Sequence, residues 1–285
     1  MRSAAWVPGR RQAVLALAAL ASGTAMGAPG GLPSNVGHAD GSPEWDKLRA
    51  ALFQQRPITT DPTRLQIVVP LRAAYGASVP VKVLAKLPQT EALYVKRLTL
   101  LVDKNPSPVA AQFELTPAIG QADIETRLRV DEYSHVRAIA ELSTGELLMD
   151  SRYVKTSGGC SAPPNRDHLA DLGKTVFRLP EGVRLGAPTP VDLTVVHPND
   201  SGFELNNVTV MFIPPHFVRS IRASYGGQRL FDAELDFSIA ENPSFRFNFV
   251  PNGPGLLKAE VEDSKDGRFV GTLMVETGAA VALKP

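Results

Sequence analysis

The stretch SVPVKVLAKL, residues 78–87, decides the fold class because its apolar side chains recur at every second position. Val79, Val81 and Val83 alternate with Pro80 and Lys82, the spacing of a β-strand with one buried face. Comparable runs follow one another at intervals of about 8 to 12 residues, as in antiparallel β-sandwiches. The predicted strands are residues 65–71, 78–87, 94–103, 109–117, 123–131, 134–142, 147–156, 175–180, 190–197, 207–214, 218–226, 228–237, 245–251, 255–264 and 268–277.

The strand pattern stops once, at KTSGGCSAPPNRD, residues 155–167, and then resumes. This polar, turn-rich segment divides the predicted strands into two sets of similar size. The sequence therefore predicts an all-β protein of two antiparallel β-sandwich domains, residues 44–157 and 171–285, joined by a linker over residues 158–170.

One helix is expected before the first strand. EWDKLRAALFQQ, residues 44–55, places Trp45, Leu48, Leu52 and Phe53 at helical spacing. Ser42 and Pro43 precede it and form a typical helix start. The sequence predicts a short amphipathic N-terminal helix there.

Composition describes an ordinary globular protein and excludes some partners. Of the 285 residues, 44% are hydrophobic and 21% are charged. The 30 lysines and arginines nearly balance the 29 acids, so the chain lacks the positive charge typical of proteins that bind nucleic acid or anionic membranes.

The N-terminus has the features of an export signal. Arg2, Arg10 and Arg11 precede an apolar run too short to span a bilayer, and small residues then offer a cleavage site before Ala28. We interpret residues 1–27 as a signal peptide, and the arginine pair also fits a twin-arginine signal. After cleavage no membrane span is expected.

Cys160 is the single cysteine of the chain, so it cannot form an internal disulfide. A buried cysteine acting as a small hydrophobe is one interpretation. The local composition favours another, an exposed thiol, because serines, glycines and prolines surround it and provide no apolar face. Gly158, Gly159 and Ser161 then form a flexible arm, and two prolines stiffen the chain after it. Whether two chains join through Cys160 stays open.

No other motif indicates catalysis or a bound metal. The five histidines, at positions 38, 135, 168, 197 and 216, show no metal-ligand spacing, and no nucleophile elbow, phosphate loop or dinucleotide fingerprint occurs. His168 is the histidine nearest to Cys160, but a flexible segment is a poor support for a catalytic pair. We predict no catalytic residue, no metal and no cofactor.

Several stretches resemble a known pair of proteins. The first half resembles SoxY, the sulfur-carrying subunit of the thiosulfate-oxidising carrier SoxYZ, in YGASVPVKV, DKNPSPVAAQFEL, IETRLRV, VRAIAELSTGEL and KTSGGC. The second half resembles SoxZ in VVHPNDSGF, IPPHFVRSI, DFSIAENPSFRFNFV and GLLKAEVEDSKDGRF. The chain is most similar to the fused, quinoprotein dehydrogenase-associated form. The resemblance implies immunoglobulin-like sandwiches.

The resemblance also implies a function. In SoxY a cysteine in a Gly-Gly-Cys-Gly-Gly tail holds sulfur intermediates covalently, and Cys160 stands in its place. Ser161 and Ala162 replace the following glycines, and the chain continues into the second domain. We therefore expect a non-catalytic periplasmic carrier whose partners are sulfur-oxidation enzymes. Two alternatives stay open: an accessory or assembly protein for a periplasmic quinoprotein (PQQ) alcohol dehydrogenase with its cytochrome components, and a purely structural sandwich.

Overall fold

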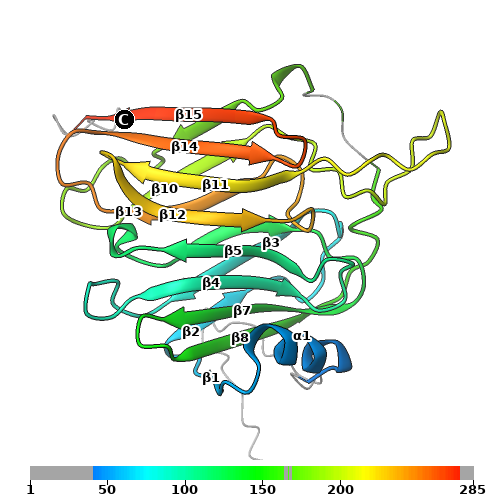
Figure 1. The fold of residues 1–285 in the computed structure, drawn as a ribbon, viewed down its shortest axis with the longest axis horizontal. Coiled ribbons are helices and arrows are strands. Elements are labelled where there is room, and N and C mark those ends of the chain that lie inside the picture. The colour runs from blue at the N-terminus through cyan, green and yellow to red at the C-terminus, as the bar shows by residue number, and fades with distance from the viewer. Residues whose placement is uncertain (1–40, 164–165, 167–168, 277–285) are drawn as a thin grey trace, which may run out of the picture. The chain divides into compact units, whose positions relative to one another are not determined.

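The described chain is built on two stacked β-sheets (Figure 1). The computed structural model describes residues 41–163, 166 and 169–276, all within a unit of residues 34–285. The predicted signal peptide lies outside these residues. The elements are α1 Pro43–Phe53, β1 Ile58–Thr60, β2 Leu65–Val68, β3 Val79–Ala85, β4 Val95–Val102, β5 Val109–Leu115, η1 Pro117–Ile119, β6 Ile124–Leu128, β7 Ser134–Leu142, β8 Leu147–Val154, η2 Leu169–Asp171, β9 Thr175–Arg178, β10 Thr189–Val195, β11 Val218–Tyr225, β12 Gln228–Leu235, β13 Ser244–Phe249, β14 Gly255–Asp263 and β15 Arg268–Val275.

The all-β class with one short N-terminal helix is confirmed. Helix α1 begins where the sequence predicts, because the Ser42 hydroxyl accepts a hydrogen bond from the Trp45 amide and Pro43 occupies the first turn. Its buried Trp45 and Phe53 pack on the nine-stranded sheet. No helix among the described residues is long and apolar enough to cross a membrane.

The two halves of the chain share both sheets, which the sequence did not predict. The larger sheet has the order β1-β8-β7-β4-β5-β12-β11-β14-β15, and the smaller has β2-β3-β6-β13-β10-β9. Strand β5 of the first half pairs along its length with β12 of the second. Strands β6 and β13 also meet, at the Glu125–Arg246 pair. Two predicted sandwiches therefore meet edge to edge as continuous layers.

One apolar core fills the space between the sheets and crosses the junction of the halves. The Phe113 ring from β5 contacts Phe231 and Phe245 of the second half in edge-on geometry, each with ring centroids 5.8 Å apart. Such aromatic pairs add to the free energy gained by burying their area. This shared core therefore joins the two halves.

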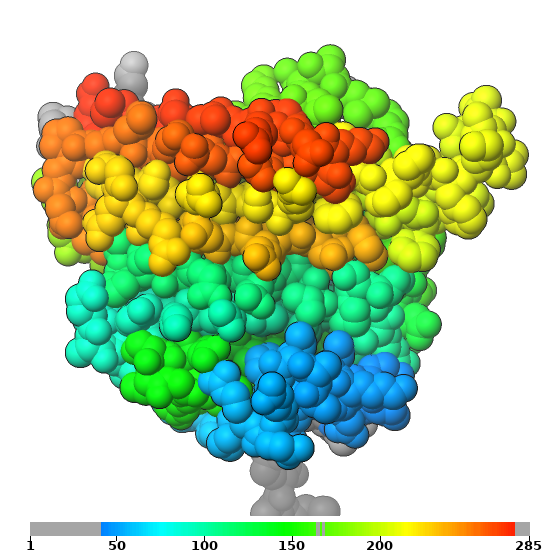
Figure 2. Space-filling model, in the orientation of Figure 1, coloured from blue at the N-terminus to red at the C-terminus, as the bar shows by residue number. Residues whose placement is uncertain are grey.

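One predicted strand is wrong. Residues 207–214 lie in a projecting hairpin, with a single bridge between Leu205 and Phe212, instead of in a sheet. Figures 1 and 2 show it as the yellow segment beside the second half. Val208 is 91% exposed, so the apolar character of this stretch does not reflect burial.

Candidate functional site

Cys160 is buried, which contradicts the exposed thiol expected from its polar neighbours. The residue is only 1% exposed. It lies in the segment that follows β8, residues 156–162, which we call the cysteine segment. The composition of this segment failed as a guide because the backbone, and not an apolar face, packs into the protein.

The two glycines before Cys160 serve that packing. Gly158 has φ +72°, a left-handed conformation that favours glycine, with open space beside it. Gly159 lies so close to the backbones of Gly76 and Val130 that a Cβ would overlap both. The expected flexible arm of Gly158, Gly159 and Ser161 is thus found docked. Of these three, Gly159 is buried, whereas Gly158 and Ser161 are exposed.

Hydrogen bonds from the first half fix the docked backbone. The Gly158 amide donates to the Asp131 carbonyl at 2.7 Å, and the Gly159 amide to the Val130 carbonyl at 3.1 Å. The Cys160 amide donates to Asp131 Oδ1 at 3.1 Å. Three consecutive amides therefore have partners in the loop after β6.

The second half covers the segment with residues 197–204, which we call the cover loop. Ser201 Oγ donates to the Cys160 carbonyl. Arg129 joins the two halves, because Nη1 donates to the Gly159 carbonyl and Nη2 to the Asn199 carbonyl, each at 3.0 Å. Glu204 lies 3.6 Å from this buried guanidinium. The cysteine is therefore held at the junction of the halves.

Acidic groups dominate the surroundings of the thiol. Burial is the main cause that raises the pKa of Cys160 to about 12, and Asp131 adds to it, while Arg129 opposes and Glu204 and Asp236 reinforce the rise. The docked thiol is therefore protonated and unreactive at neutral pH. Arg152 and Arg166, the arginines nearest to Cys160 in the sequence, form ion pairs with Asp150 and Asp200.

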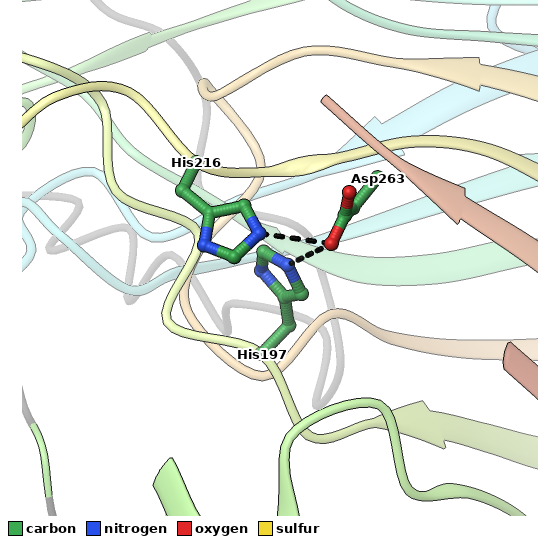
Figure 3. A group of neighbouring side chains, drawn as sticks. All are labelled: His197, His216 and Asp263. Carbon is green, nitrogen blue, oxygen red and sulfur yellow. Dashed lines mark hydrogen bonds and ion pairs between the residues drawn. The ribbon is translucent and has the colours of Figure 1, made fainter. Parts of the chain in front are cut away.

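A second cluster was missed by the sequence analysis. The rings of His197 and His216 both approach one carboxylate oxygen of Asp263 (Figure 3). His216 Nε2 lies 2.8 Å and His197 Nε2 3.5 Å from Asp263 Oδ2. No spacing rule could find them, because they come from the cover loop, the approach to β11 and the end of β14. Their ligand atoms lie within 4.8 Å of one another, close enough for a metal ion.

The position of the proton on the His197 ring decides whether this cluster suits a metal ion. The Asn199 amide donates to His197 Nδ1 at 3.1 Å, so Nδ1 carries a lone pair and the neutral ring has its proton on Nε2. A metal at Nε2 needs the opposite tautomer, with Nδ1 as a donor. Asp263 Oδ1 also accepts the Lys265 and Gly267 amides. Asp263 is therefore bonded to His216 and to the turn after β14. His197 of the cover loop lies beside the same carboxylate, and its Nε2 has no hydrogen-bond partner among the described residues.

His135 is the remaining histidine among the described residues. His135 is buried against the Tyr153 ring, 3.9 Å from Asp103. His38 and His168 lie outside the described residues, and so does the pairing of Cys160 with His168 that we considered. The prediction of no catalytic residue and no metal stays a prediction.

Fold and site together define an all-β protein of two joined sandwich halves with one thiol held between them. Residues 49–160 match the family model of the sulfur oxidation protein SoxY. Residues 177–273 match that of the sulphur oxidation protein SoxZ. The chain therefore belongs to the SoxYZ sulfur-carrier family, with both subunits fused in one polypeptide.

Among solved structures, SoxY from Chlorobium limicola f thiosulfatophilum is 27% identical, over 40% of this chain and 91% of that one, with a TM-score of 0.34. A superoxide reductase (neelaredoxin) T24K from Ignicoccus hospitalis is 15% identical, over 34% and 93%, with a TM-score of 0.31. A β-glycosidase from Bacteroides vulgatus is 8% identical, over 81% and 26%, with a TM-score of 0.24. These TM-scores are too low to carry an argument. No curated protein matches the sequence.

Proposed function

We propose that the protein is a non-catalytic carrier that holds a small sulfur-containing group covalently on Cys160 and presents it to sulfur-oxidation enzymes. One observation carries the proposal: the SoxY match ends at residue 160, and that residue is the single cysteine of the chain. The export signal predicted over residues 1–27 supports a periplasmic location.

The docked and undocked states of the cysteine segment have different chemistry. In the docked state burial keeps the thiol protonated. Once released, the thiol has the ordinary pKa of about 8.5, so a few per cent is thiolate at neutral pH. That thiolate attacks one sulfur of an incoming S–S bond, forms a new S–S bond, and the other sulfur leaves with the electron pair. Loading therefore requires the segment to leave its site.

The reach of the segment follows from its length. Six residue steps separate Val154, the end of β8, from Cys160. Fully extended, they span at most about 20 Å. Because the chain continues to η2 at Leu169, the thiol travels as the tip of a loop instead of a free tail. A partner must therefore bring its active site close to the junction of the halves.

Intact mass spectrometry of protein isolated from its host without reductant tests the carrier proposal. We expect an added mass of sulfur, thiosulfonate or another thiol-dependent group, which reductant removes and which Cys160→Ser lacks. The absence of any such adduct, together with a Cys160→Ser strain that oxidises reduced sulfur normally, would overturn it.

A second candidate follows from the burial of the thiol. An accessory or assembly protein for a periplasmic quinoprotein (PQQ) alcohol dehydrogenase and its cytochrome components would need no reactive cysteine. Because Cys160 is only 1% exposed, its burial favours this candidate more strongly than the amino-acid sequence alone does. Co-purification with such a dehydrogenase that is unchanged by Cys160→Ser would support it over the carrier.

A further inference from the structure

The groups around Cys160 come from three separate parts of the chain and are mostly negative. Asp131 lies on the loop after β6, Glu204 on the cover loop and Asp236 on the loop after β12, and each disfavours an anion at the sulfur. Arg129 is the one cation among the charges that act on the thiol. We call these four residues the charged ring.

The positive charge of Arg129 is already engaged. The guanidinium lies 3.6 Å from Glu204 and donates to the carbonyls of Gly159 and Asn199. With Glu204 offsetting Arg129, the carboxylates of Asp131 and Asp236 are left without a positive partner inside the ring. Asp131 is also the residue that holds the Cys160 amide, so its charge stays beside the sulfur as long as the segment is docked.

Burial adds to this repulsion. An ion loses its hydration when it enters a site that is closed to water, and it regains that free energy only from opposite charge or from hydrogen-bond donors. The hydrogen bonds at the docked segment satisfy its backbone, and the charged ring gives no net positive charge to the side chain.

We propose that the charged ring sorts the groups carried on Cys160 by their charge. A neutral sulfur group stays docked and protected, whereas an anionic group such as a sulfonate releases the cysteine segment into solvent. The inference rests on the proposed carrier function and adds the condition for undocking: the charge of the carried group. A carrier of this kind shields its empty thiol and exposes its loaded form.

A matched pair of chemical adducts tests the proposal on the full chain. Cys160 is treated in mild urea with the 2-carbamoylethyl or the 2-carboxyethyl ester of methanethiosulfonate, and the urea is then removed. In each reaction the thiolate forms a disulfide with the reagent sulfur, methanesulfinate leaves with the electron pair, and the thiol proton goes to the buffer. The two adducts have nearly the same size and shape and differ in charge at pH 7.

Hydrogen exchange of the peptide that contains residues 158–161 is the readout, because the amides of Gly158, Gly159 and Cys160 are all bonded in the docked state. We expect the neutral adduct to exchange like the unmodified protein. The anionic adduct should exchange about 100-fold faster.

Asp131→Asn is the matched variant, since the amide oxygen can still accept the Cys160 N–H while the charge is gone. It should slow exchange of the anionic adduct about tenfold and leave that of the neutral adduct unchanged. Equal loss of protection by both adducts would mean that the site excludes them by volume. Equal retention would mean that the Arg129 Nε–H, which has no hydrogen-bond partner among the described residues, donates to the carboxylate of the adduct. Either result, exclusion of both adducts or acceptance of both, overturns charge sorting. Because both adducts are made in vitro, neither result bears on whether the host loads Cys160.

Discussion

The cysteine segment and the projecting hairpin, residues 203–214, differ in exposure in the opposite way to what their compositions suggest. The first is polar and glycine-rich, yet Cys160 is 1% exposed and Ala162 7%. The second carries Val208, Val210 and Phe212, which are 91%, 76% and 65% exposed. Backbone hydrogen bonds and close glycine contacts bury the first segment. In the second, Phe203 packs against the Phe237 ring, whereas Val208, Val210 and Phe212 stay exposed. Large exposed apolar patches mark interaction sites.

Gly159→Ala should have the largest effect, exposure of the cysteine segment, because the new Cβ would overlap the backbones of Gly76 and Val130. Backbone atoms on both sides cannot move away cheaply, and overpacking costs about 3 kcal/mol at the upper end. We expect the rate of Cys160 alkylation by a maleimide to rise about 100-fold, with the stability of the sheets unchanged.

Gly158→Ala is the control for that experiment. Its Cβ would enter open space, and the φ of +72° costs about 1 kcal/mol for a residue other than glycine. Alkylation should rise about fivefold. If Gly159→Ala raises the rate no more than Gly158→Ala does, the tight docking of the cysteine segment is wrong.

His197 is buried in the cover loop, which also carries the Ser201 contact to Cys160 and leads into the hairpin. Burial, reinforced by His216, lowers the pKa of His197 from 6.5 to about 4. Between these values the unfolded chain binds a proton that the folded protein does not, so the free energy of unfolding should fall as the pH drops from 6.5 to 4. The loss should reach about 3 kcal/mol, measured by urea unfolding across this range.

His197→Asn isolates that effect, since the amide oxygen of asparagine can accept the residue 199 N–H and does not titrate. The variant should lose most of the slope between pH 4 and 6.5. Further loss below pH 3.8 should remain, because hydrogen bonds from His216 and the Gly267 and Lys265 amides lower the pKa of Asp263 to about 2 in spite of its burial. An unchanged slope in the variant would assign the pH dependence to other groups.

Ser201→Ala tests the contact that the second half makes with Cys160. It removes the hydroxyl that donates to the Cys160 carbonyl and that also accepts the Phe203 amide. A lost hydrogen bond of this kind costs about 1 kcal/mol, so alkylation should rise about fivefold. Cys160 kinetics identical to those of the unmodified protein would show that the cover loop does not hold the segment.

The sequence predicted the sheets well because period-two alternation in β3, β10 or β13 reports directly which face is buried. It could not predict the joined sheets, because the pairing of β5 with β12 depends on strand edges that carry no such signal. The cluster of His197, His216 and Asp263 was invisible for a similar reason, since tertiary structure alone brings them together. Cys160 itself was found, but its burial depends on backbone packing around Gly159.

The hairpin should show the smallest effect and so sharpen the comparison from its other side. Val208→Ser replaces a side chain that is 91% exposed, and we expect the free energy of unfolding to change by less than about 0.5 kcal/mol. Val130→Ser, the same substitution at a residue that is 0% exposed and lies behind Gly159, should cost at least about 2 kcal/mol. Urea unfolding at two protein concentrations measures both variants. A loss of unfolding free energy in Val208→Ser that grows with protein concentration would mean that the hairpin is buried against a second copy of the chain. The contrast with the cysteine segment would then hold for the isolated chain alone.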